Sequence, residues 1–310
     1  MDVFRQSSFW VRAWEEARRN SLYGRALPGR EGSAWWDRRA AGFAARGRSG
    51  QTQKRVAKVL HLLGHHGGLE PEAEVLDIGC GPGNYALALA RRVKRVVALD
   101  PSPAMLSQLQ ARMEEEGIHN IEPVQLPWEE VDLDELGWRG RFRAVLALMT
   151  PGIHDVPTLK KMIDASAGIC LLAGHLRQEE EARRELWPKV MGEALPPLPE
   201  DVLYVFALLY SWGYLPSLEL ERRSGTRDMT AEEAVEELLN FFYPYTELSE
   251  KVRQAVEDYV KARSRDGIYR EQREFVTAYV CWSVGTPGEQ RGELLTGAKG
   301  WDKIKACGRK

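Results

Sequence analysis

A glycine-rich loop is the segment of this sequence whose residue types and spacing most clearly could do chemistry. It reads Val75-Leu76-Asp77-Ile78-Gly79-Cys80-Gly81-Pro82-Gly83-Asn84-Tyr85, between an apolar run and a predicted helix. Glycines let a ligand approach the backbone closely, and the first N–H groups of a helix are free to bind it. The segment therefore predicts a ligand-binding loop.

The positions of one glycine and one acid distinguish between two classes of ligand. A dinucleotide site needs Gly-x-Gly-x-x-Gly, but the third glycine, Gly83, comes one residue early. Asp77 would repel a pyrophosphate by on the order of 1–4 kcal/mol at 4 Å. The same carboxylate would attract S-adenosylmethionine, which has no phosphate and carries a sulfonium and an ammonium group. A second acid, Asp100, ends the next predicted strand, where it can accept both ribose hydroxyls.

Alternating strands and helices must position these acids. Apolar runs predict strands at 75–78, 95–99, 120–126, 142–148 and 168–172, with helices at 85–92, 102–116 and 156–165 between them. This alternation with short connections is typical of a parallel sheet covered by helices on both faces. Beyond it, the pattern predicts helices at 201–212, 231–242 and 249–264 and strands at 218–221 and 274–284.

The two acidic segments together resemble the class I S-adenosylmethionine-dependent methyltransferases. Asp77 to Gly83 is similar to their first motif, and Leu99-Asp100-Pro101-Ser102-Pro103-Ala104-Met105-Leu106 to their second. The resemblance covers residues 55–175 well and extends more weakly to about 284. It implies an α/β, Rossmann-like, doubly wound and mostly parallel seven-stranded sheet with an antiparallel last strand. It also implies an enzyme that transfers a methyl group from S-adenosyl-L-methionine.

The chain is longer than such a core, so we expect additions to it. We place an N-terminal helical extension at 1–54, the core at 55–230, and the last core strand with a tail at 265–310. A helical insertion at 231–264 splits the final hairpin. The family places inserted segments over the active site as a lid, and the resemblance implies that role here.

The resemblance assigns cofactor contacts position by position. Those that would surround the methionine, the ribose, the adenine and the methyl group are Asp77, Gly79, Gly81, Gly83, Asp100, Met105, Gln125, Trp128 and Met149. Two of them have a second interpretation. Met105 could be ordinary core, and Trp128 could cover the sheet edge instead of stacking on adenine.

Two histidines follow predicted strands at the edge where open α/β sheets bind ligands. His154 comes after the fourth strand and His175 after the fifth. Either is a candidate general base if the acceptor must lose a proton, and either could be structural or solvated. The pair His65-His66 lacks partners at metal-ligand spacing, so we expect no metal.

Composition bears on where the protein works. Four cysteines lie scattered without metal-like spacing, which is typical of a reducing compartment. No signal peptide or apolar run of roughly 18–20 residues is present, so we expect a cytoplasmic protein without a membrane span.

The N-terminal segment has an unusual composition. Of ten tryptophans, four fall in the first 36 residues, and residues 1–60 hold thirteen Lys or Arg against five Asp or Glu. Basic residues beside aromatics are compatible with a nucleic-acid surface or with a solvated helical extension. The aromatics are equally compatible with one wall of an acceptor pocket, and Trp36, Tyr243 and Tyr245 are its candidates.

The segment after the fourth predicted strand lacks two motifs of the family and so limits the class of methyl acceptor. The fourth strand is followed by Met149-Thr150-Pro151-Gly152. This is neither the Asn/Asp-Pro-Pro-aromatic motif of the family's exocyclic-amine enzymes nor a Pro-Cys. We therefore favour a small-molecule acceptor. The alternatives are an RNA or protein methyltransferase that docks through its basic N-terminus, and a protein that binds S-adenosylmethionine without turnover.

Overall fold

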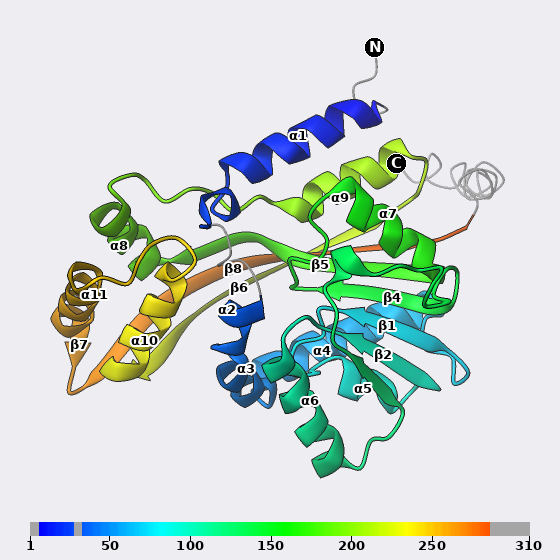
Figure 1. The fold of residues 1–310 in the computed structure, drawn as a ribbon, viewed down its shortest axis with the longest axis horizontal. Coiled ribbons are helices and arrows are strands. Elements are labelled where there is room, and N and C mark those ends of the chain that lie inside the picture. Colours follow the sequence, from blue (N-terminus) through cyan, green and yellow to red (C-terminus); the bar gives the residue numbers. More distant parts are fainter. Residues whose placement is uncertain (1–5, 28–32, 286–310) are drawn as a thin grey trace, which may run out of the picture.

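The computed structural model describes residues 6–27 and 33–285. Its centre is an eight-stranded sheet in the order β3-β2-β1-β4-β5-β8-β6, with β7 paired to β8 (Figure 1). Strands β1 to β5 are parallel, and β8 is antiparallel to both β5 and β6. The strands are β1 (Glu74–Ile78), β2 (Arg95–Leu99), β3 (Ile121–Val124), β4 (Phe142–Leu148), β5 (Ser166–Glu180), β6 (Ser217–Thr230), β7 (Ser264–Arg265) and β8 (Ile268–Ser283). The predicted fold class is confirmed.

Helices bury both faces of the parallel part. On one face Leu76 and Val97 pack with α7 (Val156–Ala165) and α9 (Asp201–Ser211). On the other face Val75 and Val96 pack with α4 (Gly50–His65), α5 (Ala86–Ala90) and α6 (Pro103–Glu116). Because successive strand residues point to opposite faces and both faces are covered, these strands are apolar at nearly every position. That is why their apolar runs predict them.

Strands β5, β6 and β8 are much longer than their apolar parts and continue as an antiparallel ribbon (Figure 1). The sequence pattern predicts only 168–172, 218–221 and 274–284 as strand. The missed part is held by cross-strand charge pairs, such as Arg270 with Asp228 at 2.6 Å and Arg273 with Glu180 at 3.5 Å. Such stretches lack an apolar face, so alternation of hydrophobicity does not reveal them.

A second hydrophobic core lies against the ribbon. It joins α8 (Glu181–Met191), which the sequence pattern missed, to α10 (Ala231–Phe242) and α11 (Glu250–Arg263). Pro188 lies inside α8, where a proline is uncommon. The ring of Trp187 lies 6.0 Å from that of Phe241 and 6.1 Å from that of Phe242. Both phenylalanines are buried in this second core.

The N-terminal segment runs along the outside of this framework as α1 (Ser7–Asn20), η2 (Tyr23–Arg25), α2 (Ser33–Asp37) and α3 (Ala40–Gly47). Helix α1 lies beside α9 (Figure 1), where the buried Trp14 indole donates to Asp201 Oδ1 at 2.6 Å. Asp37 at the end of α2 accepts the Ser102 hydroxyl at 2.5 Å, at the start of α6. Within residues 6–27 and 33–285, no helix is long and apolar enough to cross a bilayer.

Candidate functional site

The loop after β1 has a backbone that only glycine adopts without strain. Gly79, Gly81 and Gly83 have φ angles of +69°, +55° and +79°. A Cβ on Gly79 would lie 2.1 Å from the Thr150 hydroxyl oxygen, so this glycine permits close packing of the loop on the end of β4. A Cβ on Gly81 would meet only a methionine sulfur at 3.9 Å, so its side of the loop is open. The middle of the loop thus leaves room for a ligand.

Asp100, after β2, shapes this loop. Its Oδ2 accepts the Gly81 N–H at 2.8 Å, and its Oδ1 accepts the Ser102 N–H at 2.9 Å. Burial raises the pKa of Asp100, while these two N–H groups act in the opposite direction. The side chain lies at the cavity described below.

Asp77 lies behind the loop and is 1% exposed. Its Oδ2 is buried and has no hydrogen-bond partner. Burial, and secondarily the charge of Asp100, raise the pKa of Asp77 to about 7. Because an unpartnered buried carboxyl is costly, this acid and the open glycine loop fit a ligand that brings a positive charge.

A cavity of about 800 Å³ opens at the carboxyl ends of β1, β2 and β4. Part of the lining comes from the glycine loop and the segments after β2, β3 and β4. The rest comes from the N-terminal segment, α4 and the residues after α10. This second group of residues, which we call the wall, includes Arg18, Tyr23, Trp35, Trp36, Phe43, Thr52, Arg55, Pro244 and Tyr245. Chain segments far apart in the sequence therefore enclose one space.

Most of the expected cofactor contacts line this cavity: Gly79, Gly81, Asp100, Met105, Trp128 and Met149. Asp77, Gly83 and Gln125 are not among the described lining residues. The Trp128 indole is 2% exposed and donates to the Thr158 carbonyl at 3.0 Å, so it also anchors the loop after β3 to α7. Met149, directly after β4, has a φ of +58°, a strained value for a side-chain-bearing residue.

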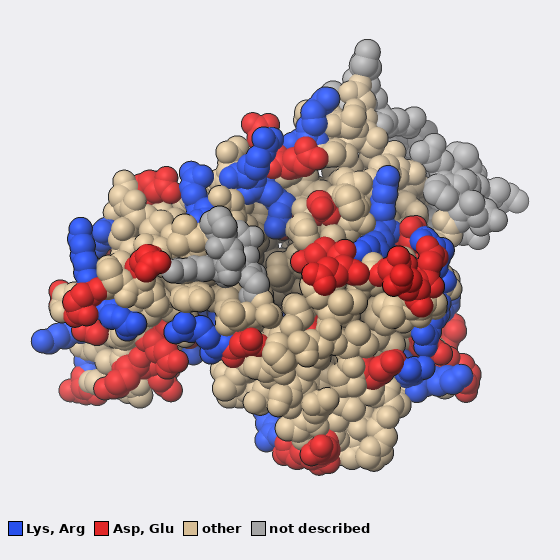
Figure 2. All heavy atoms as spheres, viewed as in Figure 1, with Lys and Arg blue, Asp and Glu red and all other residues tan. Residues whose placement is uncertain are grey.

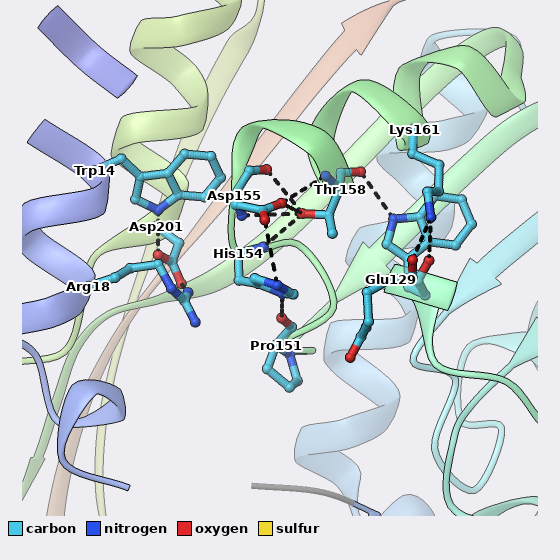
Figure 3. A network of polar contacts seen from close by, with 10 residues as sticks. Trp14, Arg18, Glu129, Pro151, His154, Asp155, Thr158, Lys161 and Asp201 are labelled. Carbon is cyan, nitrogen blue, oxygen red and sulfur yellow. Dashed lines mark hydrogen bonds and ion pairs between the residues drawn. The ribbon is translucent and has the colours of Figure 1, made fainter. Parts of the chain in front are cut away.

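The two candidate histidines occupy different environments. His154 lines the cavity, and its Nδ1 lies 3.1 Å from the Pro151 carbonyl oxygen (Figure 3). Since a carbonyl only accepts, Nδ1 carries the proton and Nε2 is the basic nitrogen. His175 is not among the described lining residues, and its Nδ1 contacts the Thr277 hydroxyl at 3.3 Å. Burial, followed by the charges of neighbouring arginines, lowers the pKa of His175 to about 4.

The candidate aromatic wall is only partly as expected. Trp36 and Tyr245 line the cavity, and the rings of Trp36 and Trp35 lie 4.4 Å apart. Tyr243 is not among the described lining residues, and its ring is covered by the Arg38 guanidinium at 4.7 Å. The tryptophans of the first 36 residues therefore have different roles. Trp35 and Trp36 line the cavity, whereas Trp14 joins α1 to α9.

Sequence reasoning missed several lining residues, among them Arg18, Arg55 and Tyr85. Tyr85 directly follows the glycine loop, so its position was a usable signal. The arginines lie among thirteen basic residues in residues 1–60, and nothing in their spacing distinguishes those that point inward.

The strand order, the glycine loop after β1 and the acid after β2 define the Rossmann-like fold of class I S-adenosylmethionine-dependent methyltransferases. The comparison with known proteins agrees, since residues 75–170 match the family described as a methyltransferase domain. Residues 75–170 therefore form a methyltransferase domain with the class I fold, and S-adenosylmethionine is the cofactor of that class.

Individual relatives differ in how much they share with the chain. An uncharacterized protein of Haemophilus influenzae is 25% identical over 260 residues, which is 80% of this chain and 88% of that protein. A tRNA/tmRNA (uracil-C(5))-methyltransferase of Stutzerimonas stutzeri is 40% identical over 62 residues, 20% of this chain and 17% of that protein. A ubiquinone biosynthesis O-methyltransferase of Acinetobacter baylyi is 40% identical over 73 residues, 24% of this chain and 30% of that protein. The chain thus spans less than a third of either named enzyme.

Proposed function

We propose that this methyltransferase acts on a small molecule held between the cofactor loop and the N-terminal wall. The observation that carries the proposal is the cavity of about 800 Å³ that these segments line together. Small-molecule sites typically measure roughly 300–1,000 Å³. Because cofactor and acceptor must share this space, the acceptor group that enters it is small. One relative is, by its name, an O-methyltransferase of ubiquinone biosynthesis, and ubiquinone is a small molecule.

The distribution of charge supports the same proposal. Several basic residues of the N-terminal segment contact acids of the same chain, as Arg18 does with Asp201 at 2.5 Å and Arg25 with Glu193 at 3.1 Å. Lys58 likewise pairs with Glu219. On the face shown in Figure 2, basic and acidic side chains are interspersed. A nucleic-acid surface would instead present a basic stripe.

His154 is our candidate general base. When bound, the cofactor supplies a methyl group on a sulfonium, and the displacement needs an acceptor atom in line with it. His154 Nε2 is available to take a proton from a hydroxyl or ammonium acceptor, because Nδ1–H is held by the Pro151 carbonyl. Asp155 Oδ2 lies 3.9 Å from Nε2 and would stabilise the protonated ring. His175 fits this role poorly, because its lowered pKa makes it a weak base.

The test is methyl transfer from labelled S-adenosylmethionine to a panel of phenols, amines and thiols, with total tRNA assayed in parallel. We expect a product with a small molecule and little dependence on salt concentration. Transfer to tRNA that falls steeply with salt would favour the docking alternative. Binding of S-adenosylhomocysteine without transfer to any substrate would favour the non-catalytic one.

His154→Gln provides the matched variant. Gln keeps a hydrogen-bonding side chain but cannot act as a base. We expect kcat to fall by roughly 10²–10⁴-fold with little change in cofactor affinity. An unchanged kcat and pH profile would show that no proton passes through His154.

A further inference from the structure

Arg55 is a cavity-lining arginine that lacks a counter-charge. It lies on α4, and its Nη2 donates to the Thr52 hydroxyl at 3.1 Å. Its Nε is buried without a hydrogen-bond partner, and no ion pair joins it to a carboxylate within the part of the chain that the structure describes. Arg18, the other arginine among the described lining residues, is held by Asp201 at 2.5 Å.

The acids that line the cavity and Arg55 come from different segments of the chain. These acids are Asp100, Glu129 and Glu130, which follow β2 and β3. These strand ends belong to the cofactor side. Arg55 comes from α4, and neither α4 nor the N-terminal segment contributes an Asp or Glu among the described lining residues. The acids suit a cationic cofactor, whereas Arg55 suits a negative group.

Two more arginines of the N-terminal segment lie against aromatic residues that line the cavity. The Arg39 guanidinium lies 4.7 Å from the Trp35 ring, and the Arg46 guanidinium lies 4.8 Å from the Phe43 ring. Burial, and next to it the charge of other arginines, lower the pKa of Arg39 to about 10. Glu237 is the acid whose charge most opposes those of Arg39 and Arg46. It already accepts hydrogen bonds from Arg227 and Arg273.

We propose that the methyl acceptor carries a carboxylate or phosphate group and that Arg55 binds it. This inference rests on the proposed small-molecule function. A guanidinium presents a planar fork of N–H donors that matches such an oxyanion, and its buried Nε would gain the partner that it lacks. The apolar body of the acceptor would lie against Trp36 and Phe43, which line the same wall.

Binding to the protein saturated with S-adenosylhomocysteine tests this inference without turnover. The probes are benzoate, phenyl phosphate and the uncharged benzamide, measured by calorimetry. The variants are Arg55→Gln and Arg55→Lys, with Arg48→Gln as the control, because Arg48 is exposed and pairs with Glu115. We expect an anionic probe to bind more tightly than benzamide, and Arg55→Gln to weaken it at least tenfold. Arg55→Lys should be intermediate, and Arg48→Gln should match the wild type.

Two results would overturn the proposal. One is benzamide binding as tightly as benzoate and phenyl phosphate, which decides the matter even if Arg55→Gln does not fold. The other concerns the cofactor, whose amino-acid part also has a carboxylate. If Arg55→Gln weakens S-adenosylhomocysteine but not 5′-methylthioadenosine, which lacks that part, Arg55 holds the cofactor instead. Anion binding through Arg55 without any methyl transfer would refute the proposed function and leave the anion site standing.

Discussion

Replacing Asp77 with Asn tests whether this buried acid is reserved for a positively charged ligand. In the protein without cofactor the pKa of Asp77 is raised from 3.8 to about 7. The unfolded chain therefore releases this proton more readily than the folded one. The cost to stability grows as pH rises from about 4 to about 7 and stays constant above that. At 1.36 kcal/mol per pKa unit, the full cost is about 4 kcal/mol.

Asp77→Asn removes this cost because the amide does not ionise. Relative to the wild type, the variant should gain up to about 4 kcal/mol in the free energy of unfolding between pH 4 and pH 8. Its affinity for S-adenosylmethionine should fall, and the ratio of wild-type to variant affinity should rise from pH 5.5 to pH 7.5 as Asp77 ionises. Urea unfolding across pH and calorimetry measure the two effects.

The control is Asp266→Asn, at an exposed position in the turn between β7 and β8. It makes the same chemical change and should alter neither quantity. The proposed role of Asp77 is refuted if the two variants show the same pH dependence of stability. It is refuted equally if Asp77→Asn binds the cofactor as tightly as the wild type does at pH 7.5.

Three further changes test the loop and the second core. Asp100→Ala should weaken S-adenosylhomocysteine binding by roughly 1.5–3 kcal/mol through lost charge-assisted hydrogen bonds, and an unchanged Kd in calorimetry would show that Asp100 does not bind the ribose. Gly79→Ala places a Cβ 2.1 Å from the Thr150 hydroxyl at a φ of +69°, so thermal melting should show a loss of roughly 1–3 kcal/mol together with loss of cofactor binding. Burial raises the pKa of Glu237, but the charges and hydrogen bonds of Arg273 and Arg227 outweigh burial and lower this pKa to about 2. Glu237→Gln should therefore cost about 3 kcal/mol above pH 4.5, a difference that shrinks as pH falls toward 2 and that unfolding at both pH values would reveal.

The cofactor half of the site could be predicted because its signals are local. Asp77 and the glycines stand within seven residues of one another, and Asp100 ends the next strand. Strands buried on both faces are apolar runs that stand out in the sequence. The sheet order then brings these segments to one edge.

The wall of the cavity could not be predicted with the same certainty because long-range contacts form it. Trp14 bonds to Asp201, which lies 187 residues away, and Trp35 donates to the Asn240 carbonyl, which lies 205 residues away. Composition indicated an aromatic, basic segment without showing which side chains face the cavity. Only the fold distinguishes Trp36, which lines the cavity, from Trp14, which joins α1 to α9.

The match to the family covers only one of the two groups of residues that line the cavity. The match to the methyltransferase family spans residues 75–170, which hold the loop and strands on the cofactor side. The wall comes from residues within 18–26 and 33–55 and from Pro244 and Tyr245, all outside that match. Relatives that share only 62 or 73 residues with the chain therefore need not share its acceptor. We therefore propose that the residues that select the acceptor are those of the wall, and that Arg55 favours an acceptor with a negative group.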